Sequence, residues 1–232
     1  YRGNELGRQL RPTLYDFIAH RAVDFFSLSE PELAKPAYAF ELDKEAYLAD
    51  SKTFIDLSLS SKDSTSMKFY ALQIFQELER FHINDADPAA LVDVNLKRLK
   101  FVKNHLTLST KNELYLNAIE NLERKVSDNE VVGKVTVEKA RIFVESASQY
   151  KPLQGDDHKW DLKKAFELCE AAKKRFPDSD GAILCENLQE DILSKSVSAE
   201  LEEVNVPGLP FRSLVSYKNF TDLHYRIIKV TR

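Results

Sequence analysis

Apolar residues recur every three or four positions along most of this chain, a spacing typical of amphipathic helices. The first such run begins just after Pro12, and proline suits the first turn of a helix because its missing N–H needs no partner there. The spacing therefore predicts a helix over residues 12–27. Its apolar face consists of Leu14, Phe17, Ile18, Ala22, Phe25 and Phe26.

Short polar residues that can cap a helix, in one case followed by proline, precede several further apolar runs. Each run is long enough for three or more helical turns. The predicted helices extend from Asp63 or Ser64 to Phe81, from Asp87-Pro88 to Leu106, from Ser109 or Thr110 to Leu122, and over about 131–150, 161–176 and 179–194.

Residues 29–62 interrupt this periodicity. The sequence predicts an ordered but irregular connector here, because proline and a loss of period mark breaks between regular elements. The signals are Pro31, Pro36 and the run at 38–42, which mixes apolar and polar residues without a period. We expect a short helix within it, near 45–57.

The C-terminal ends of three predicted helices resemble one another. The runs that end at Phe81, Val126 and Phe176 each carry basic residues, and each precedes a turn with Asn or Asp and then a new helix. These three residues lie 45 and 50 positions apart. Such separations are typical of stacked helix pairs.

The third of these units is closest to a tetratricopeptide repeat. Its inner turn, residues 151–160, is longer than the strict 34-residue pattern allows. The predicted fold is therefore mainly α, an α-α superhelix of tetratricopeptide-like helix pairs. Ala147 and Tyr150 lie late on the first helix of the unit, and Ala165, Cys169, Ala172 and Pro177 occupy the small, large, small and proline positions of the second.

Beyond Ser194, apolar and polar residues alternate, which predicts two or three β-strands near 201–206, 211–217 and 223–227, with Pro207-Gly208 between the first two. A short β-segment cannot close a core of its own. We therefore expect residues 196–232 to begin a β-domain that continues past Arg232, after a helical repeat domain over residues 1–195.

The composition excludes several partners. The 232 residues carry a net charge of −4 without a basic stripe, which argues against nucleic acid and anionic lipid. No apolar stretch approaches the roughly 18 to 20 residues of a membrane-spanning helix. Because the chain starts at Tyr1 rather than Met, we expect it to be an excised piece of a longer protein.

Candidate chemistry is sparse. The five histidines lie outside any catalytic motif, and the six glycines are too isolated to form a phosphate-binding loop. We therefore expect no enzyme activity, no catalytic, cofactor-binding or metal-binding residue, and no cofactor. In the cluster Asp156-Asp157-His158, a solvated turn is favoured over a weak cation site.

Four other features have a structural and a functional interpretation. For Cys169 and Cys185, buried free thiols are favoured over a disulfide. His20 is expected to pack within the scaffold, and the sequon Asn219-Phe220-Thr221 is assigned no function. The loop between Pro152 and Trp160 is either a contact surface or, the favoured alternative, folded back over the helices.

Two regions of the chain resemble a known family. Leu10-Arg-Pro-Thr-Leu-Tyr-Asp-Phe-Ile-Ala-His-Arg-Ala-Val-Asp-Phe-Phe26, followed by Lys35-Pro-Ala-Tyr-Ala-Phe40, resembles the N-terminal helical region of large alpha-2-macroglobulin-like proteins of Bacteroidetes. Pro210-Phe211-Arg212, Tyr217-Lys-Asn-Phe220 and Tyr225-Arg-Ile227 resemble the strands that lead into the first macroglobulin-type β-domain. The family's thioester motif Cys-Gly-Glu-Gln is absent here, and no catalytic residue is carried over.

The resemblance implies a protease inhibitor of the periplasm or cell envelope, membrane-anchored through a removed N-terminal signal. We favour a non-catalytic scaffold and interaction module of such a protein, because this explains the change from helices to strands. Its partners would be downstream β-domains of the same chain, and proteases or another envelope protein, with no nucleic acid or small-molecule substrate. The alternative is a stand-alone tetratricopeptide-like adaptor that binds a protein or peptide in a concave groove.

Overall fold

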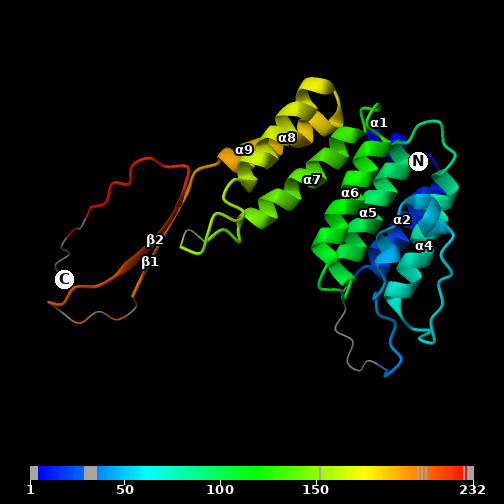
Figure 1. Cartoon of the computed structure of the whole chain (residues 1–232), viewed down its shortest axis with the longest axis horizontal. Helices are drawn as coiled ribbons and strands as arrows, with labels where there is room; N and C mark the ends of the chain where they lie inside the picture. The colour runs from blue at the N-terminus through cyan, green and yellow to red at the C-terminus, as the bar shows by residue number, and fades with distance from the viewer. Residues whose placement is uncertain are drawn as a thin grey trace.

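The computed structural model describes residues 5–28, 36–151, 153–202, 204, 206, 208–226 and 228, and this part of the chain is mainly helical, as the periodicity predicts. Figure 1 shows a bundle of α1–α6, then the three helices α7–α9, then a β-hairpin. The predicted features at Pro31, Lys35, Pro152, Pro207 and Ile227 lie outside the described residues. The elements are α1 (Glu5–Leu10), α2 (Leu14–Phe26), the 3-10 helix η1 (Glu45–Leu48), α3 (Ser51–Ile55), α4 (Met67–His82), α5 (Ala89–His105), α6 (Lys111–Lys125), α7 (Val132–Ala147), α8 (Asp161–Arg175), α9 (Asp180–Leu193), β1 (Ser196–Leu201) and β2 (Ser213–Lys218).

Side-chain caps explain where several helices begin. At the start of α2, the Thr13 hydroxyl oxygen accepts from the Asp16 N–H at 3.3 Å, and the Asp16 carboxylate accepts from the Thr13 N–H at 2.9 Å, which forms a capping box. α4 begins slightly later than predicted because Ser66 is its cap. Asp63 instead accepts from the Thr65 N–H in the preceding turn, at 3.0 Å.

The short helix α1 has no counterpart among the predicted elements. Its sequence, Glu-Leu-Gly-Arg-Gln-Leu, is too short to show an apolar period. Leu10 packs against the main core, α1 contacts α5, and the Gln9 amide donates to Asp87 at 3.3 Å. Tertiary contacts therefore support a helix that the local sequence does not reveal.

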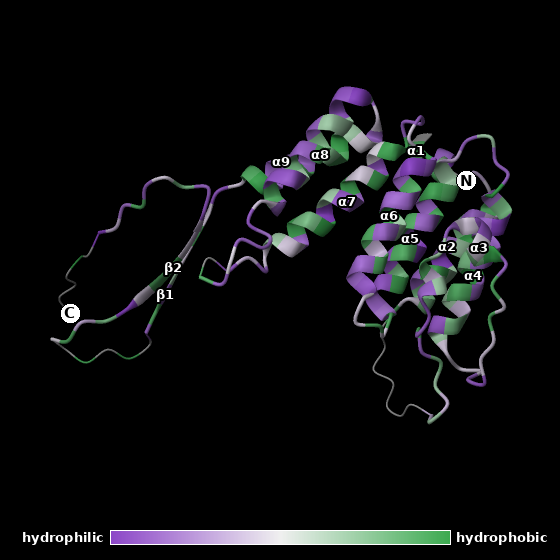
Figure 2. Ribbon diagram, viewed as in Figure 1, coloured by the Kyte–Doolittle hydropathy of each residue, from purple (hydrophilic) through white to green (hydrophobic). Residues whose placement is uncertain are grey.

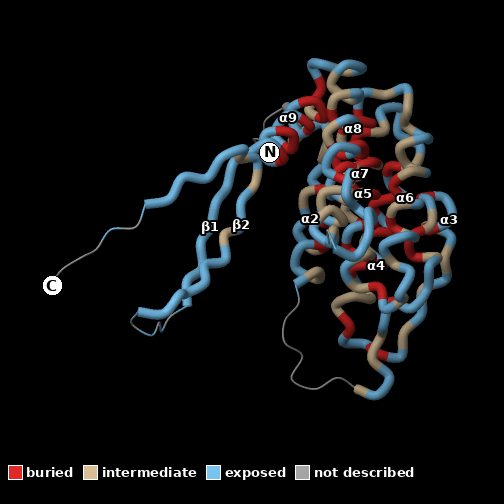
Figure 3. Tube along the Cα trace, turned by 60° about the vertical axis from the view of Figure 1, so that its left-hand side comes forward, coloured by how far each residue is buried: buried red, intermediate tan, exposed pale blue. Residues whose placement is uncertain are grey.

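The larger core lies among α2, α4, α5, α6 and the connector. Figure 2 shows hydrophobic and hydrophilic stretches alternating along these helices, and Figure 3 shows the buried residues gathered inside them. The connector contains η1 and α3 where a short helix near 45–57 is predicted, and Leu42 forms a β-bridge with Leu106. Fully buried apolar residues of this core include Phe54, Phe75, Leu78 and Ile119.

A second, smaller core lies among α7, α8 and α9, and each of these helices contacts the other two. α7 and α9 approach each other closely at Gly133 and Gly181, where a Cβ on Gly181 would lie 2.5 Å from the Gly133 Cα. The mainly helical fold is confirmed, whereas its assignment to a tetratricopeptide-like superhelix stays a prediction. The buried residues are Val137, Ala140, Ala165, Cys169, Cys185, Leu188 and Ile192.

β1 and β2 pair antiparallel as a hairpin that follows α9. β2 lies where a strand near 211–217 is predicted, but β1 begins at Ser196, earlier than the predicted strand near 201–206. This start was missed because Val197 and Ala199 alternate with serines, which is a weak apolar signal. Among the described residues of 219–226 there is no third strand.

Candidate functional site

A groove of about 870 Å³ opens between the η1–α3 segment, the C-terminal end of α4, and the helices α5 and α6. Its floor is apolar and includes the buried residues Leu48, Val92 and Leu99. Half-buried side chains of α5 and α6, among them Leu91 and Leu122, line its sides. This volume lies within the range of about 300–1,000 Å³ that is typical of ligand sites in proteins.

Polar residues define the rim of the groove. Lys52, Arg124 and Lys125 are exposed and line it, and Lys125 forms an ion pair with Asp50 at 3.3 Å. At the floor, the Asn95 amide donates to the Ser51 hydroxyl at 2.5 Å. The groove therefore combines an apolar interior with a basic rim.

A buried arginine fixes one side of this groove. Arg98, on α5, donates to the Glu79 carboxylate at 2.6 Å and to the backbone carbonyls of Tyr47 and Ala49 at 2.5 and 2.8 Å. Its guanidinium lies 4.1 Å from the centre of the Phe54 ring. Because one cation contacts α4, η1 and α3, it holds the connector against the helices.

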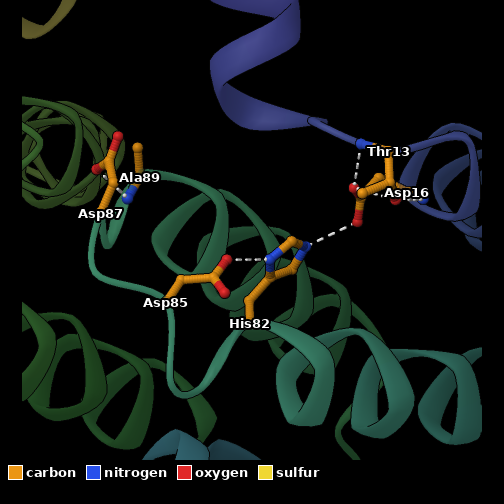
Figure 4. Close-up of polar contacts among 6 residues, drawn as sticks. All are labelled: Thr13, Asp16, His82, Asp85, Asp87 and Ala89. Carbon is orange, nitrogen blue, oxygen red and sulfur yellow. Dashed lines mark hydrogen bonds and ion pairs between the residues drawn. The ribbon is translucent and has the colours of Figure 1, made fainter.

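A second buried cluster joins α2 to α4 (Figure 4). The two ring nitrogens of His82 each lie 2.7 Å from a carboxylate oxygen, one of Asp16 and one of Asp85. Carboxylate oxygens accept hydrogen bonds, so the imidazole ring bridges Asp16 and Asp85 through both of its nitrogens. Asp16 also caps α2, so a single carboxylate both starts that helix and ties it to the end of α4. The polar contacts of His82 among the described residues are these two carboxylates.

His20, in contrast, is a neutral buried histidine. Burial, followed by the nearby charges of Arg11 and Lys97, lowers its pKa to about 4. The Lys97 ammonium lies 3.4 Å from its Nδ1, and the side chain is fully buried among the helices, as the sequence predicts.

The cluster at 156–158 forms a turn before α8. Asp156 pairs with Lys159 at 3.0 Å, whereas His158 donates to Asp161 at 2.7 Å. Burial opposes the charge on Asp161, but hydrogen bonds from Ser146, Lys164 and His158 lower its pKa to about 2. Among the described residues, no group of three or more His, Cys, Asp or Glu is placed to hold a metal ion.

The loop before α8 corrects one expectation. The prediction that it folds back over the helices is wrong, because the described residues 153–160 are all exposed, with Leu153 at 100% and Trp160 at 59%. The loop sequence is mostly polar, with Asp156, Asp157, His158 and Lys159 in succession, which suits an exposed turn.

Two other predicted features have structural roles. Cys169 and Cys185 are free and fully buried in the smaller core, and a hydrogen bond with Cys169, followed by burial, raises the pKa of the Cys185 thiol. Asn219 has a φ of 58° and donates from its amide to the Ile192 and Ser194 carbonyls at 2.8 and 2.9 Å. The sequon asparagine therefore fastens the hairpin to the end of α9, a role that its tolerance of the left-handed conformation could have indicated.

No protein-family model, no curated protein and no solved structure matches this chain. Within the described part of the chain, no helix has the length and apolar character needed to cross a membrane.

Proposed function

We propose that this chain is a non-catalytic scaffold and interaction module of a macroglobulin-like protease inhibitor of the bacterial cell envelope. The proposal rests on the resemblance at both ends of the chain, and it includes the periplasm or cell envelope as its location. Its role would be to hold β-structure in a fixed position relative to a rigid helical body.

The observation that carries this proposal is the apolar face of the hairpin. In the register of β1 and β2, Val197 lies opposite Tyr217 and Ala199 lies opposite Val215, and Leu201 continues the same face. Val197 and Tyr217 are 52% and 65% exposed, and Figure 3 shows most of the hairpin exposed. An isolated two-stranded hairpin is marginally stable in water, so this face needs a covering layer. A β-domain of the same native polypeptide would supply one.

The hairpin is attached to the helices in a defined orientation. Besides the two bonds from Asn219, the Lys218 ammonium donates to the Asp191 carbonyl at 2.6 Å. These bonds satisfy carbonyls at the C-terminal end of α9, which have no partner within the helix. A fixed attachment of this kind supports the role of a scaffold.

The proposal is tested on the native polypeptide purified from its own cells. Intact mass and peptide mapping are expected to place β-domains of about 100 residues after the hairpin, and the full protein is expected to trap an added protease. Tyr217→Asp, on the apolar face, should increase cleavage near the hairpin and weaken trapping, whereas Ser216→Asp, on the opposite face, should change neither. A native polypeptide without β-domains, or equal effects of the two variants, would overturn the proposal.

A second candidate function is a stand-alone adaptor that binds a peptide. The observation that favours it is the groove between α3, α5 and α6, which joins a buried apolar floor to an exposed polar rim. Filling the groove by Ala118→Trp should abolish peptide binding while leaving the hairpin unaffected. Binding that survives this substitution would place the peptide elsewhere.

A further inference from the structure

The groove lined by η1, α3, α5 and α6 is positively charged on a protein that is acidic as a whole. Three cations and one carboxylate line it, namely Lys52, Arg124, Lys125 and Asp50. The whole chain has a net charge of −4. The local excess of positive charge is therefore a property of this groove rather than of the general surface.

Two of these cations lack an ionic partner. Asp50 pairs with Lys125, which neutralises one positive charge. Arg124 contacts the amide oxygen of Asn121, a neutral group. Within the described part of the chain, no carboxylate forms an ion pair with Lys52 or Arg124. Both cations remain available to a carboxylate from outside.

The floor of the groove adds a hydrogen-bond acceptor. Asn95 is only 3% exposed and lines the groove, and its amide nitrogen is engaged by Ser51. No donor among the described residues bonds to its amide oxygen. An amide carbonyl that faces an open groove is suited to accept an N–H, which a peptide backbone offers and a fatty acid does not.

We propose that this groove binds a segment of a partner protein in which apolar side chains are followed by Asp or Glu. The apolar side chains would lie against Leu48, Val92 and Leu99, and the carboxylates would pair with Lys52 and Arg124. This inference rests on the adaptor function proposed above as the second candidate, and it names the chemistry of the partner. Charge complementarity of this kind sets specificity and the rate of association.

The test selects peptides from a random phage-displayed library of about twelve residues, the length of roughly three helical turns, against the immobilised chain. Counter-selection uses Ala118→Trp or, should that variant not fold, Asn121→Trp at an exposed position of the same groove. We expect the enriched peptides to share acidic residues beside two or more apolar residues. Synthetic versions should bind the chain, as measured by fluorescence anisotropy.

Charge reversal then tests the acidic character of the partner separately from the adaptor function itself. In the double variant Lys52→Glu/Arg124→Glu the affinity for acidic peptides should fall at least tenfold, whereas the matched surface variant Lys163→Glu/Lys174→Glu should bind within twofold of the unmodified chain. If groove-dependent peptides are neutral or basic, or bind the first variant unchanged, the acidic partner is overturned and the adaptor stands. If no enriched peptide depends on the groove, or anionic vesicles alone bind there, the adaptor function fails as well.

Discussion

The two cores of the helical part are held together by different kinds of contact. In the bundle of α1–α6, buried ions link segments that are far apart in sequence, as Arg98 links α5 to the connector and Asp16 links α2 to α4. In the unit of α7–α9, two helices approach each other closely at Gly133 and Gly181, and alanines, cysteines and larger aliphatic residues form the core. Regular helices can pack by shape alone. The connector has no apolar period, and it is held both by the burial of residues such as Phe54 and by directional hydrogen bonds from a buried cation.

The largest expected effect is the loss of the buried arginine. Arg98→Met leaves the Glu79 carboxylate buried without its cation, and breaking a buried pair in this way costs about 3–5 kcal/mol. The free energy of unfolding, from urea titration followed by circular dichroism, measures the loss.

Two controls sharpen this result. Arg175→Met, in the α7–α9 unit, removes an exposed pair with Asp128 and should cost at most about 1 kcal/mol. The double variant Arg98→Met/Glu79→Met should be more stable than Arg98→Met alone. An Arg98→Met variant as stable as Arg175→Met would mean that buried charge does not hold the bundle.

The neutral histidine of the bundle predicts a pH dependence. His20 has a folded pKa of about 4, below its ordinary value near 6.5, so the unfolded state binds the proton more readily. The stability from this group is fully present above pH 6.5 and is lost as the pH falls to about 4, by up to about 3 kcal/mol. Urea midpoints at pH 7, 6, 5 and 4 measure the loss.

His20→Leu is the matched variant, because it keeps an apolar side chain at a buried position and removes the titrating group. We expect its stability to fall less steeply than that of the unmodified chain between pH 6.5 and 4. Subtracting one curve of stability against pH from the other cancels the contribution of the carboxylates, because they titrate in both proteins. Parallel curves would mean that His20 binds its proton equally in the folded and unfolded states.

The close approach of α7 and α9 at Gly133 and Gly181 predicts a smaller loss of stability, caused by adding an atom group rather than by removing a charge. Alanine in the interior of a helix normally stabilises it by about 0.5–1 kcal/mol relative to glycine. In Gly181→Ala, the new Cβ would meet the Gly133 backbone, so we expect a net loss of about 1–3 kcal/mol through overpacking. Thermal unfolding measures the change, and Asn187→Ala, at an exposed position of α9, is the control. A stabilised Gly181→Ala would show that α7 and α9 separate freely.

The sequence predicts the elements better than it predicts their contacts. Caps and apolar spacing place α2, α5, α8 and α9 within one or two residues, because these signals are local. The groove has no such signal. Lys52 and Arg124 line the same groove because the connector packs against α5, where Arg98 bonds to it, and a contact between segments this far apart leaves no periodic trace in the sequence. The glycine pair was missed for the same reason, since neither glycine is unusual by itself.

The smallest expected effect concerns the joint between helices and hairpin. Asn219→Ala removes two hydrogen bonds to α9 and places a Cβ-bearing residue without a local hydrogen bond at a φ of 58°, which costs about 1–2 kcal/mol of local stability. Asn219→Gly keeps the conformation and loses only the amide, so it should show a smaller effect. Because no residue of β1 or β2 belongs to either helical core, global unfolding should be unchanged in both variants. Hydrogen exchange of the β1 amides should instead quicken, most in Asn219→Ala.

Unchanged hydrogen exchange would mean that the hairpin keeps its position without the bonds from Asn219. A fall in global stability would mean that the hairpin and the helices unfold as one unit.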